Sequence, residues 1–169
     1  MNPSDIAILS TVNNFELYKK SSSLYPPEIS SYVIDGRNGM HGLHSILYMF
    51  HIFKNKNIQW LIMADEDVIF QDPDEVFNII DHMERNNISV CGIRDGGVIS
   101  HRNFNPNVIN TFFSIINFKK ISQLFHKQSF LKNKYTKTDE FSDKLNFLPF
   151  KYDETSLYEP YYCFYLWLR

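Results

Sequence analysis

Cysteine is scarce in this sequence, which has only Cys91 and Cys163 among its 169 residues. Neither belongs to a CxxC pair, so the usual cysteine-based metal and redox motifs are excluded, and we expect two buried thiols in a reducing compartment. The net charge of −2 supplies no basic field, so nucleic acid is not expected as a main partner. No apolar run reaches the ~20 residues of a membrane helix, and the first residues lack a basic start and an apolar signal core. We therefore expect a cytoplasmic protein without a transmembrane segment.

The apolar residues form short segments that alternate between strand-like and helix-like spacing. Hydrophobic residues make up 44 % of a chain that is long enough for one domain with a real core. Strands that alternate with helices predict an α/β fold with a mainly parallel mixed sheet flanked by helices. The expected strands are 6–12, 31–34, 58–64, 89–93 and 111–117, and the expected helices are 15–20, 41–54, one that opens at Asp72 and one that follows Pro160.

Three consecutive acids, Asp65, Glu66 and Asp67, directly follow the apolar strand that ends at Ala64. Buried carboxylates are costly unless they are paired or bind a metal, so a function is expected for acids at this position. Ligands of open α/β sheets bind at the carboxyl ends of the strands. If the backbone stays extended, Asp65 and Asp67 point to one face and can hold a hard divalent cation that carries a diphosphate. The alternative is a polar strand end that is hydrogen-bonded to loop amides.

A second group of acids, Asp72, Asp74 and Glu75, has a structural explanation. Asp72 precedes Pro73, and Glu75 follows Asp72 by three residues, which is the pattern of a helix cap with proline at the first helical position. Asp74 and Glu75 also suit the positive end of the helix dipole. We therefore assign this group to helix initiation and the triplet 65–67 to function.

The segment Ala64–Phe70, followed by Asp72-Pro73, resembles the DxD region of nucleotide-sugar-dependent glycosyltransferases with the GT-A fold. In that family the motif ends a central strand and holds Mn²⁺ or Mg²⁺ against the donor diphosphate. The resemblance implies that Asp67 is the principal metal ligand and that Asp65 contacts the metal or the donor ribose. It also implies a nucleoside diphosphate sugar as donor and a glycan or another hydroxyl compound as acceptor.

Residues outside the triplet are also candidates for ligand binding. By the same resemblance, Thr11 and Val12 at the end of the first strand lie near the nucleotide base, and Asp35 at the end of the second strand contacts the base or the ribose. Gly96 and Gly97 follow a later strand, and without side chains their backbone amides can approach a phosphate or a sugar. The alternative for the two glycines is an ordinary tight turn.

Two late carboxylates are candidates for a catalytic base. An inverting transferase needs a carboxylate that accepts the proton of the acceptor hydroxyl. Glu159, beside an aromatic run, is the first candidate, and Asp153 is the second. The aromatic run from Tyr161 onward is apolar nearly all round, which predicts a helix that is buried or that associates with another copy of the chain.

We expect a single glycosyltransferase-like domain over residues 1–169, in which residues 5–120 bind the nucleotide sugar and residues 121–169 form the acceptor side. The interval from Thr11 to Asp65 is short for the family and is expected to lack one strand–helix unit. Family members usually continue beyond the aromatic run. The C-terminal part is therefore expected to be incomplete, as a fragment, a cut form or a natural minimal form.

The resulting hypothesis is a metal-dependent glycosyltransferase of glycan or polysaccharide assembly. One alternative is a phosphohydrolase, because residues 65–69 also resemble the nucleophile motif of haloacid-dehalogenase-like phosphatases, in which the first Asp is phosphorylated. That motif normally lies on the first strand, and no convincing second acidic set follows Asp95. The other alternative is a nucleotide-sugar-binding module that keeps the fold without turnover.

Overall fold

The computed structural model describes residues 2–137 and 145–169. The short 3-10 helices η1 (Pro3–Asp5) and η2 (Leu145–Phe147) lie before the first strand and before the last helix. The other elements follow in the order β1 (Ile6–Val12), α1 (Phe15–Ser22), β2 (Ser30–Asp35), α2 (Leu43–Phe53), β3 (Trp60–Ala64), α3 (Glu75–Arg85), β4 (Val90–Arg94), β5 (Ile109–Asn117), α4 (Phe118–Leu124), α5 (Lys127–Lys132) and α6 (Tyr162–Trp167).

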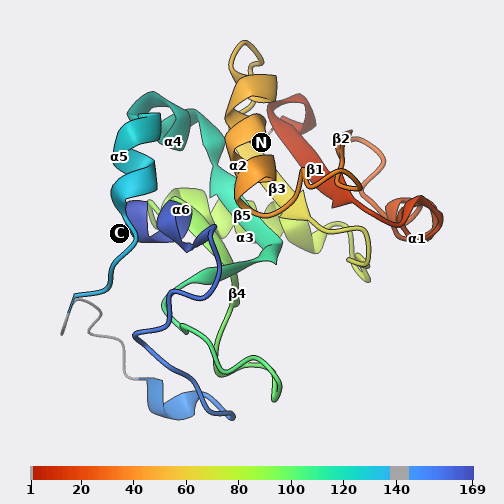
Figure 1. Ribbon diagram of the computed structural model, residues 1–169. Helices are drawn as coiled ribbons and strands as arrows, with labels where there is room; N and C mark the ends of the chain where they lie inside the picture. Colours follow the sequence, from red (N-terminus) through yellow and green to blue (C-terminus); the bar gives the residue numbers. More distant parts are fainter. Residues whose placement is uncertain (1, 138–144) are drawn as a thin grey trace. The chain divides into compact units, whose positions relative to one another are not determined.

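The strands form one mixed sheet in the order β2-β1-β3-β5-β4 (Figure 1). β1 is parallel to both of its neighbours, β2 and β3, and β3 is antiparallel to β5. The predicted α/β fold with a mixed sheet and flanking helices is therefore confirmed. All five residues of β3, the middle strand, are buried. Burial on both faces explains why this strand has a continuous apolar run instead of alternating polar and apolar residues.

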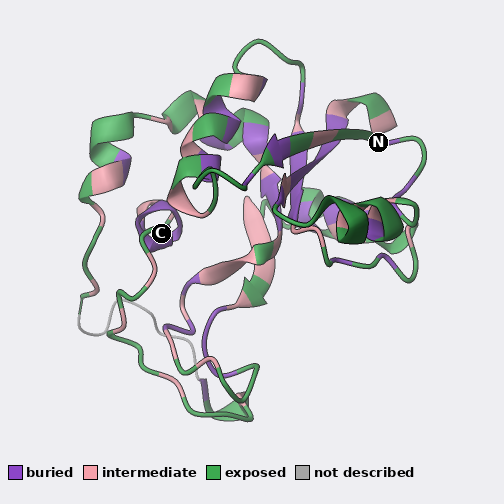
Figure 2. Ribbon diagram, turned by 45° about the vertical axis from the view of Figure 1, so that its right-hand side comes forward, coloured by how far each residue is buried: buried purple, intermediate pink, exposed green. Residues whose placement is uncertain are grey.

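Helices cover both faces of the sheet. Successive residues of a strand point to opposite sides, so the buried strands present side chains to both layers of helices. On one face, Ile8 of β1 and Ile62 of β3 belong to a buried cluster that includes side chains of α3. On the other face, α2 contributes a buried apolar stripe that consists of Ile46, Met49, Phe50 and Phe53. Figure 1 shows α2 and α3 on opposite faces, and β1 and β3, which lie between them, are buried (Figure 2).

The chain divides into two compact units. Unit 1 consists of Met1–Cys91 and Thr111–Leu124, and it contains β1 to β3 and α1 to α4. Unit 2 consists of Gly92–Asn110 and Phe125–Arg169, and it contains α5 and α6. The assignment of nucleotide-sugar binding to residues 5–120 and of the acceptor side to residues 121–169 within a single domain stays a prediction.

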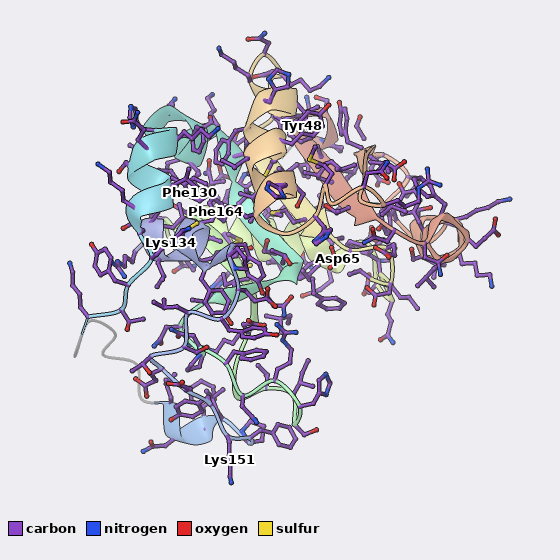
Figure 3. The ribbon with its side chains drawn as sticks, in the orientation of Figure 1. Tyr48, Asp65, Phe130, Lys134, Lys151 and Phe164 are labelled. Atoms are coloured by element: carbon purple, nitrogen blue, oxygen red, sulfur yellow. The ribbon has the colours of Figure 1, made fainter. Side chains whose placement is uncertain are left out.

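The expected C-terminal helix is present as α6, which begins at Tyr162, two residues after Pro160. In unit 2 it packs on α5, where the rings of Phe130 and Phe164 lie 5.9 Å apart at 80° (Figure 3). Tyr161–Leu166 are all buried, as predicted for an apolar helix. Trp167 and Leu168 at the end of the run are half-buried, and self-association through this helix stays a prediction. No helix in the described ranges is both long and apolar enough to cross a bilayer.

Helix α3 begins at Glu75, three residues after the predicted start at Asp72. Asp72 nevertheless organises this start, because its Oδ1 accepts a hydrogen bond from the N–H of Asp74 at 3.1 Å. Its carbonyl oxygen accepts another from the N–H of Glu75 at 3.3 Å. Pro73 therefore lies in a turn that leads into the helix. The N-cap of α3 is Asp74, and it makes no side-chain cap hydrogen bond. The prediction of Asp72 as the helix cap, with Pro73 at the first helical position, is therefore wrong, because Asp72 belongs to the turn before the helix.

Candidate functional site

The acid triplet lies in a turn at the carboxyl end of β3. The pairing with β5 extends one residue past the strand, because the N–H of Asp65 donates to the carbonyl oxygen of Phe112 at 3.0 Å. The chain then turns, and the N–H of Val68 donates to the carbonyl oxygen of Asp65 at 3.1 Å. The expectation of an extended backbone that points Asp65 and Asp67 to one face is therefore wrong. The buried side chain of Val68 fixes the end of the turn instead.

The two outer acids of the triplet differ in exposure. Asp67 is exposed, whereas Asp65, just beyond the end of β3, is half-buried (Figure 3). Burial, together with the negative charges of Glu66 and Asp67, raises the pKa of Asp65 to about 7. The end of the middle strand thus carries negative charge that no basic side chain of the turn compensates. Such a position favours the binding of a cation.

Glu66 is the acid of the triplet that has partners within the chain. Its Oε1 accepts a hydrogen bond from the N–H of Asn14 at 3.3 Å, and its carbonyl oxygen accepts one from Ser21 Oγ at 2.7 Å. Asn14 also caps α1, because its Oδ1 accepts from the N–H of Leu17 at 3.1 Å. Glu66 therefore ties the turn to the start of α1. The alternative of a strand end hydrogen-bonded to loop amides holds for this one acid.

The ends of β1 and β2 lie at the same edge of the sheet as the triplet. Leu9 pairs with Met63, so the last residues of β1 run beside the end of β3, and Val12 pairs with Asp35 of β2. The sequence candidates Thr11, Val12 and Asp35 are thus brought together at this edge. Val12 is fully buried and its carbonyl oxygen accepts a hydrogen bond from the N–H of Gly36, whereas Thr11 is half-buried.

Arg37 covers the exposed carboxylate of Asp35. Its Nε donates to Oδ1 at 2.9 Å and its Nη2 donates to Oδ2 at 2.6 Å. The hydrogen bond from the Arg37 side chain, followed by the one from its backbone, lowers the pKa of Asp35 to about 2. The guanidinium also lies 4.8 Å from the centre of the Phe15 ring. Arg37 and Phe15 are therefore neighbours of the candidate site that sequence analysis did not name.

Carboxylate oxygens are the protein ligands that Mg²⁺ and Mn²⁺ prefer. Asp65 and Asp67 supply two such groups, one half-buried and one exposed, on a turn of three residues. Within residues 2–137 and 145–169, no three His, Cys, Asp or Glu side chains are grouped so that they could hold a metal by themselves. The pair therefore fits a cation that takes its remaining ligands from water and from the phosphate oxygens of a ligand, as Mg²⁺ commonly does.

In unit 2, the fully buried carboxylate of Asp95 accepts hydrogen bonds from several distant residues. Its Oδ1 accepts from Arg102 Nε at 2.7 Å and from Asn110 Nδ2 at 2.5 Å. Its Oδ2 accepts from the hydroxyl of Tyr161 at 3.3 Å and from that of Tyr162. Sequence analysis missed this network, because the tyrosines follow Asp95 by 66 and 67 residues.

The two candidate bases belong to the same unit but have different surroundings. Glu159 is partly exposed, and its Oε1 lies 3.7 Å from Arg102 Nη2, so it borders the Asp95 network. Asp153 is exposed, and its Oδ1 accepts from Thr155 Oγ1 at 2.7 Å and from the N–H of Thr155 at 2.9 Å. These two bonds lower the pKa of Asp153 and make it the cap of a turn. Of the two, Glu159 has the carboxylate that is less engaged in local structure.

Gly96 and Gly97 are buried, and each has a structural reason to lack a side chain. A Cβ on Gly96 would lie 1.9 Å from the carbonyl oxygen of Phe104, and Gly97 has a φ of +80°, which favours glycine. The carbonyl oxygen of Gly97 also accepts a hydrogen bond from the N–H of Phe150 at 3.1 Å. The tight turn is thus explained by packing, and contact of the two glycines with a phosphate or a sugar stays a prediction.

No family model matches the sequence, and no curated protein matches it. Among solved structures, the chain is similar to the mannosyltransferase PcManGT from Pyrobaculum calidifontis in complex with GDP-Man and Mn²⁺, with a TM-score of 0.51 and 8 % sequence identity. The similarity covers 73 % of this chain and 48 % of that chain, so this chain spans about half the length of the enzyme. At this identity the likeness shows the fold alone: this α/β fold resembles a GT-A glycosyltransferase.

Proposed function

We propose that this chain binds a nucleoside diphosphate sugar together with Mn²⁺ or Mg²⁺ and transfers the sugar to an acceptor hydroxyl. The observation that carries the proposal is the half-buried carboxylate of Asp65 at the end of the middle strand, beside the ends of β1 and β2. This edge of an open α/β sheet is where ligands bind. The similar mannosyltransferase, which was solved with GDP-Man and Mn²⁺, supports this class of donor and cation.

Asp67 and Asp65 are the residues that would hold the cation. Asp67 is exposed in the turn, and Asp65 carries a charge that the turn leaves uncompensated. When bound, a divalent cation stabilises the negative charge of the departing diphosphate. Glu66 would keep both carboxylates in place, because its bonds to Asn14 and Ser21 fix the turn against α1.

The nucleoside would lie over the ends of β1 and β2. Thr11, which is half-buried, remains a candidate for contact with the base at this edge, whereas Val12 is fully buried. Asp35 would accept hydrogen bonds from the ribose hydroxyls or the base once Arg37 moves aside. That movement is easy, because both partners of the ion pair are exposed and such pairs are weak in water. Arg37 would then be free to bind a negatively charged part of the donor.

Glu159 is the carboxylate that we propose as the base for the acceptor hydroxyl. Its neighbour Arg102 is held in place by the buried Asp95, so one side of the Glu159 carboxylate faces a fixed positive charge. An ionised carboxylate in such a position can take a proton from a hydroxyl that attacks the donor sugar. Asp153 remains the second candidate, and Gly96 and Gly97 remain candidates for donor contact.

Thermal unfolding with nucleotides, followed by a donor assay, tests the proposal. The purified chain is heated with GDP, UDP, ADP or CDP, each with and without MnCl₂, and is then incubated with the matching sugar nucleotide. We expect one nucleoside diphosphate to raise the Tm only when Mn²⁺ is present, and its sugar nucleotide to release that diphosphate. Donor binding without release would indicate a binding module. Vanadate-sensitive phosphate release from p-nitrophenyl phosphate would indicate a phosphohydrolase.

A further inference from the structure

Helix α2 and the loop before it form a groove in unit 1 that the proposed donor site does not use. The cavity has a volume of about 530 Å³, and it is lined by residues 38–40 of the loop and by His44, Leu47, Tyr48 and His51 of α2. Ligand sites are typically about 300 to 1,000 Å³ and mostly apolar, with a few polar groups that orient the ligand. The groove meets this description, because Met40, Leu47 and the ring of Tyr48 supply apolar lining and Asn38 and His44 supply polar groups.

Two aromatic rings of the groove lining pack against each other. The rings of Tyr48 and His51 are stacked, with their centres 5.7 Å apart and their planes at 23° (Figure 3 labels Tyr48). Tyr48 is 42 % exposed, so much of its ring is open to solvent. Two stacked and exposed rings offer an apolar surface to a ligand that has a flat face of C–H groups.

The rest of the lining supplies hydrogen-bonding groups of both kinds. His44 Nδ1 lies 3.2 Å from the carbonyl oxygen of Gly39. A carbonyl oxygen can only accept, so Nδ1 carries the proton, and Nε2 of the neutral ring is left as an acceptor. The carboxamide of Asn38 adds a donor and another acceptor. The groove can therefore both donate hydrogen bonds to a ligand and accept them from it.

The groove is lined without Lys, Arg, Asp or Glu, which indicates a neutral ligand rather than a phosphate, a nucleic acid or a charged peptide. A hexopyranose has one face of C–H groups and an edge of hydroxyls that both donate and accept. We propose that this groove binds a neutral hexopyranose unit of the acceptor glycan. A purely apolar partner would match the two aromatic rings but would leave the ligand-facing groups of Asn38 and His44 without hydrogen bonds.

The groove shares its loop with the proposed nucleotide site, because Arg37 directly precedes Asn38 and only Gly36 separates Arg37 from Asp35. The loop follows the carboxyl end of β2, and α2 leads from it back to the start of β3. Both β2 and β3 are parallel to β1, so their carboxyl ends lie at the same edge of the sheet. The groove therefore begins at the edge that carries the acid triplet. The acceptor role rests on the proposed function, whereas the binding of a neutral sugar does not.

Saturation-transfer NMR on the full chain tests the inference, with maltotriose, mannotriose and chitotriose as probes. We compare the wild type with Tyr48→Ala, Asn38→Ala and the control Tyr135→Ala, whose side chain is 43 % exposed and belongs to unit 2. At least one trisaccharide should bind the wild type and the control, with the strongest transfer to the C–H groups of one ring face. Tyr48→Ala should weaken binding about fivefold, which is the size expected for one aromatic contact.

The outcomes separate this inference from the proposed function. No transfer from any of the three trisaccharides, or equal binding by wild type, Tyr48→Ala and Asn38→Ala, would overturn the groove as a sugar site. Both variants should keep the Mn²⁺-dependent Tm response to nucleotide, because neither residue lies in the acid triplet. If that response is absent in the wild type while sugar binding is present, the proposed transferase function fails and the groove stands as a carbohydrate site.

Discussion

Arg102 is held against the fully buried carboxylate of Asp95, with Nε 2.7 Å and Nη2 2.6 Å from the same oxygen. The other oxygen of Asp95 accepts from Tyr161 and Tyr162, which precede and begin α6. Asp95 thus joins the segment Gly92–Asn110 to the C-terminal helix within unit 2. A buried carboxylate is tolerated only while its partners are present.

Arg102→Gln is therefore expected to destabilise the protein by about 3–5 kcal/mol, because the charge of Asp95 stays buried without its cationic partner. Chemical denaturation measures this change. Glu159→Gln is the matched control, because it removes the more distant and partly exposed partner of Arg102, and it should change stability by less than about 0.5 kcal/mol. An Arg102→Gln variant as stable as the wild type would show that the burial of Asp95 does not require its ion pair with Arg102.

Asp65→Asn should stabilise the protein near neutral pH. The pKa of Asp65 is about 7 in the folded state and ~3.9 in the unfolded state, so the folded state binds more protons between these values. The favourable contribution of protonated Asp65 is complete below the unfolded pKa and is lost as the pH rises through 7. With allowance for the solvent exposure of a half-buried group, the variant should gain about 1–2 kcal/mol at pH ~7.5.

The same variant should gain much less at acidic pH, where the wild-type carboxylate is already protonated in the folded state. Denaturation curves at several pH values between about 4 and 8 show this difference. Asp67→Asn is the control, because Asp67 is exposed. A larger gain for Asp65→Asn at low pH than at neutral pH would contradict the burial of this carboxylate.

Asp72→Ala separates the acid of the turn before α3 from the triplet. It removes the acceptor for the N–H of Asp74, so it should destabilise the protein by about 1 kcal/mol, the size of one hydrogen bond. The affinity for nucleotide in the presence of Mn²⁺ should stay within a few-fold of the wild type, as measured by calorimetry. Loss of nucleotide binding without loss of stability would mean that the acids are divided wrongly between structure and function.

Deletion of residues 160–169 should leave the chain insoluble or molten. The deletion removes α6, exposes the ring of Phe130 and takes two hydrogen-bond donors away from Asp95. Circular dichroism and size-exclusion chromatography measure the outcome. A truncation after Trp167 keeps α6 and serves as the control. A monodisperse product that unfolds cooperatively without residues 160–169 would show that this helix is peripheral.

The fold could be predicted because its signals are local. The apolar run before Asp65 is long enough for a strand that is buried on both faces, and the spacing in residues 41–54 is helical, so β3 and α2 were expected close to their observed bounds. The boundaries were less accurate where a turn intervenes. Asp72 caps a turn that delays α3 to Glu75, and the bond from Val68 to Asp65 bends the triplet out of the strand direction.

The site could be predicted only in part, because much of it depends on long-range contacts. The pairing of β1 with β2 and β3 brings Thr11 and Asp35 to the edge of the triplet, as expected for parallel strands. The bond from Asn14 to Glu66 spans 52 residues, and no local pattern indicates it. The same holds for the burial of Asp95, whose partners are spread over both segments of unit 2.

The dependence of nucleotide binding on the triplet is the most direct test of the account. The Tm of wild type, Asp67→Asn and Asp72→Asn is measured with a nucleoside diphosphate at about a hundredfold excess over its Kd, with and without Mn²⁺. Binding to the folded state alone should add about 2.7 kcal/mol to the stability of the wild type and of Asp72→Asn, and only when Mn²⁺ is present. Asp67→Asn should fold normally and show no such increase. An undiminished Mn²⁺-dependent response in Asp67→Asn would contradict the assignment of this edge of the sheet as the cation and nucleotide site.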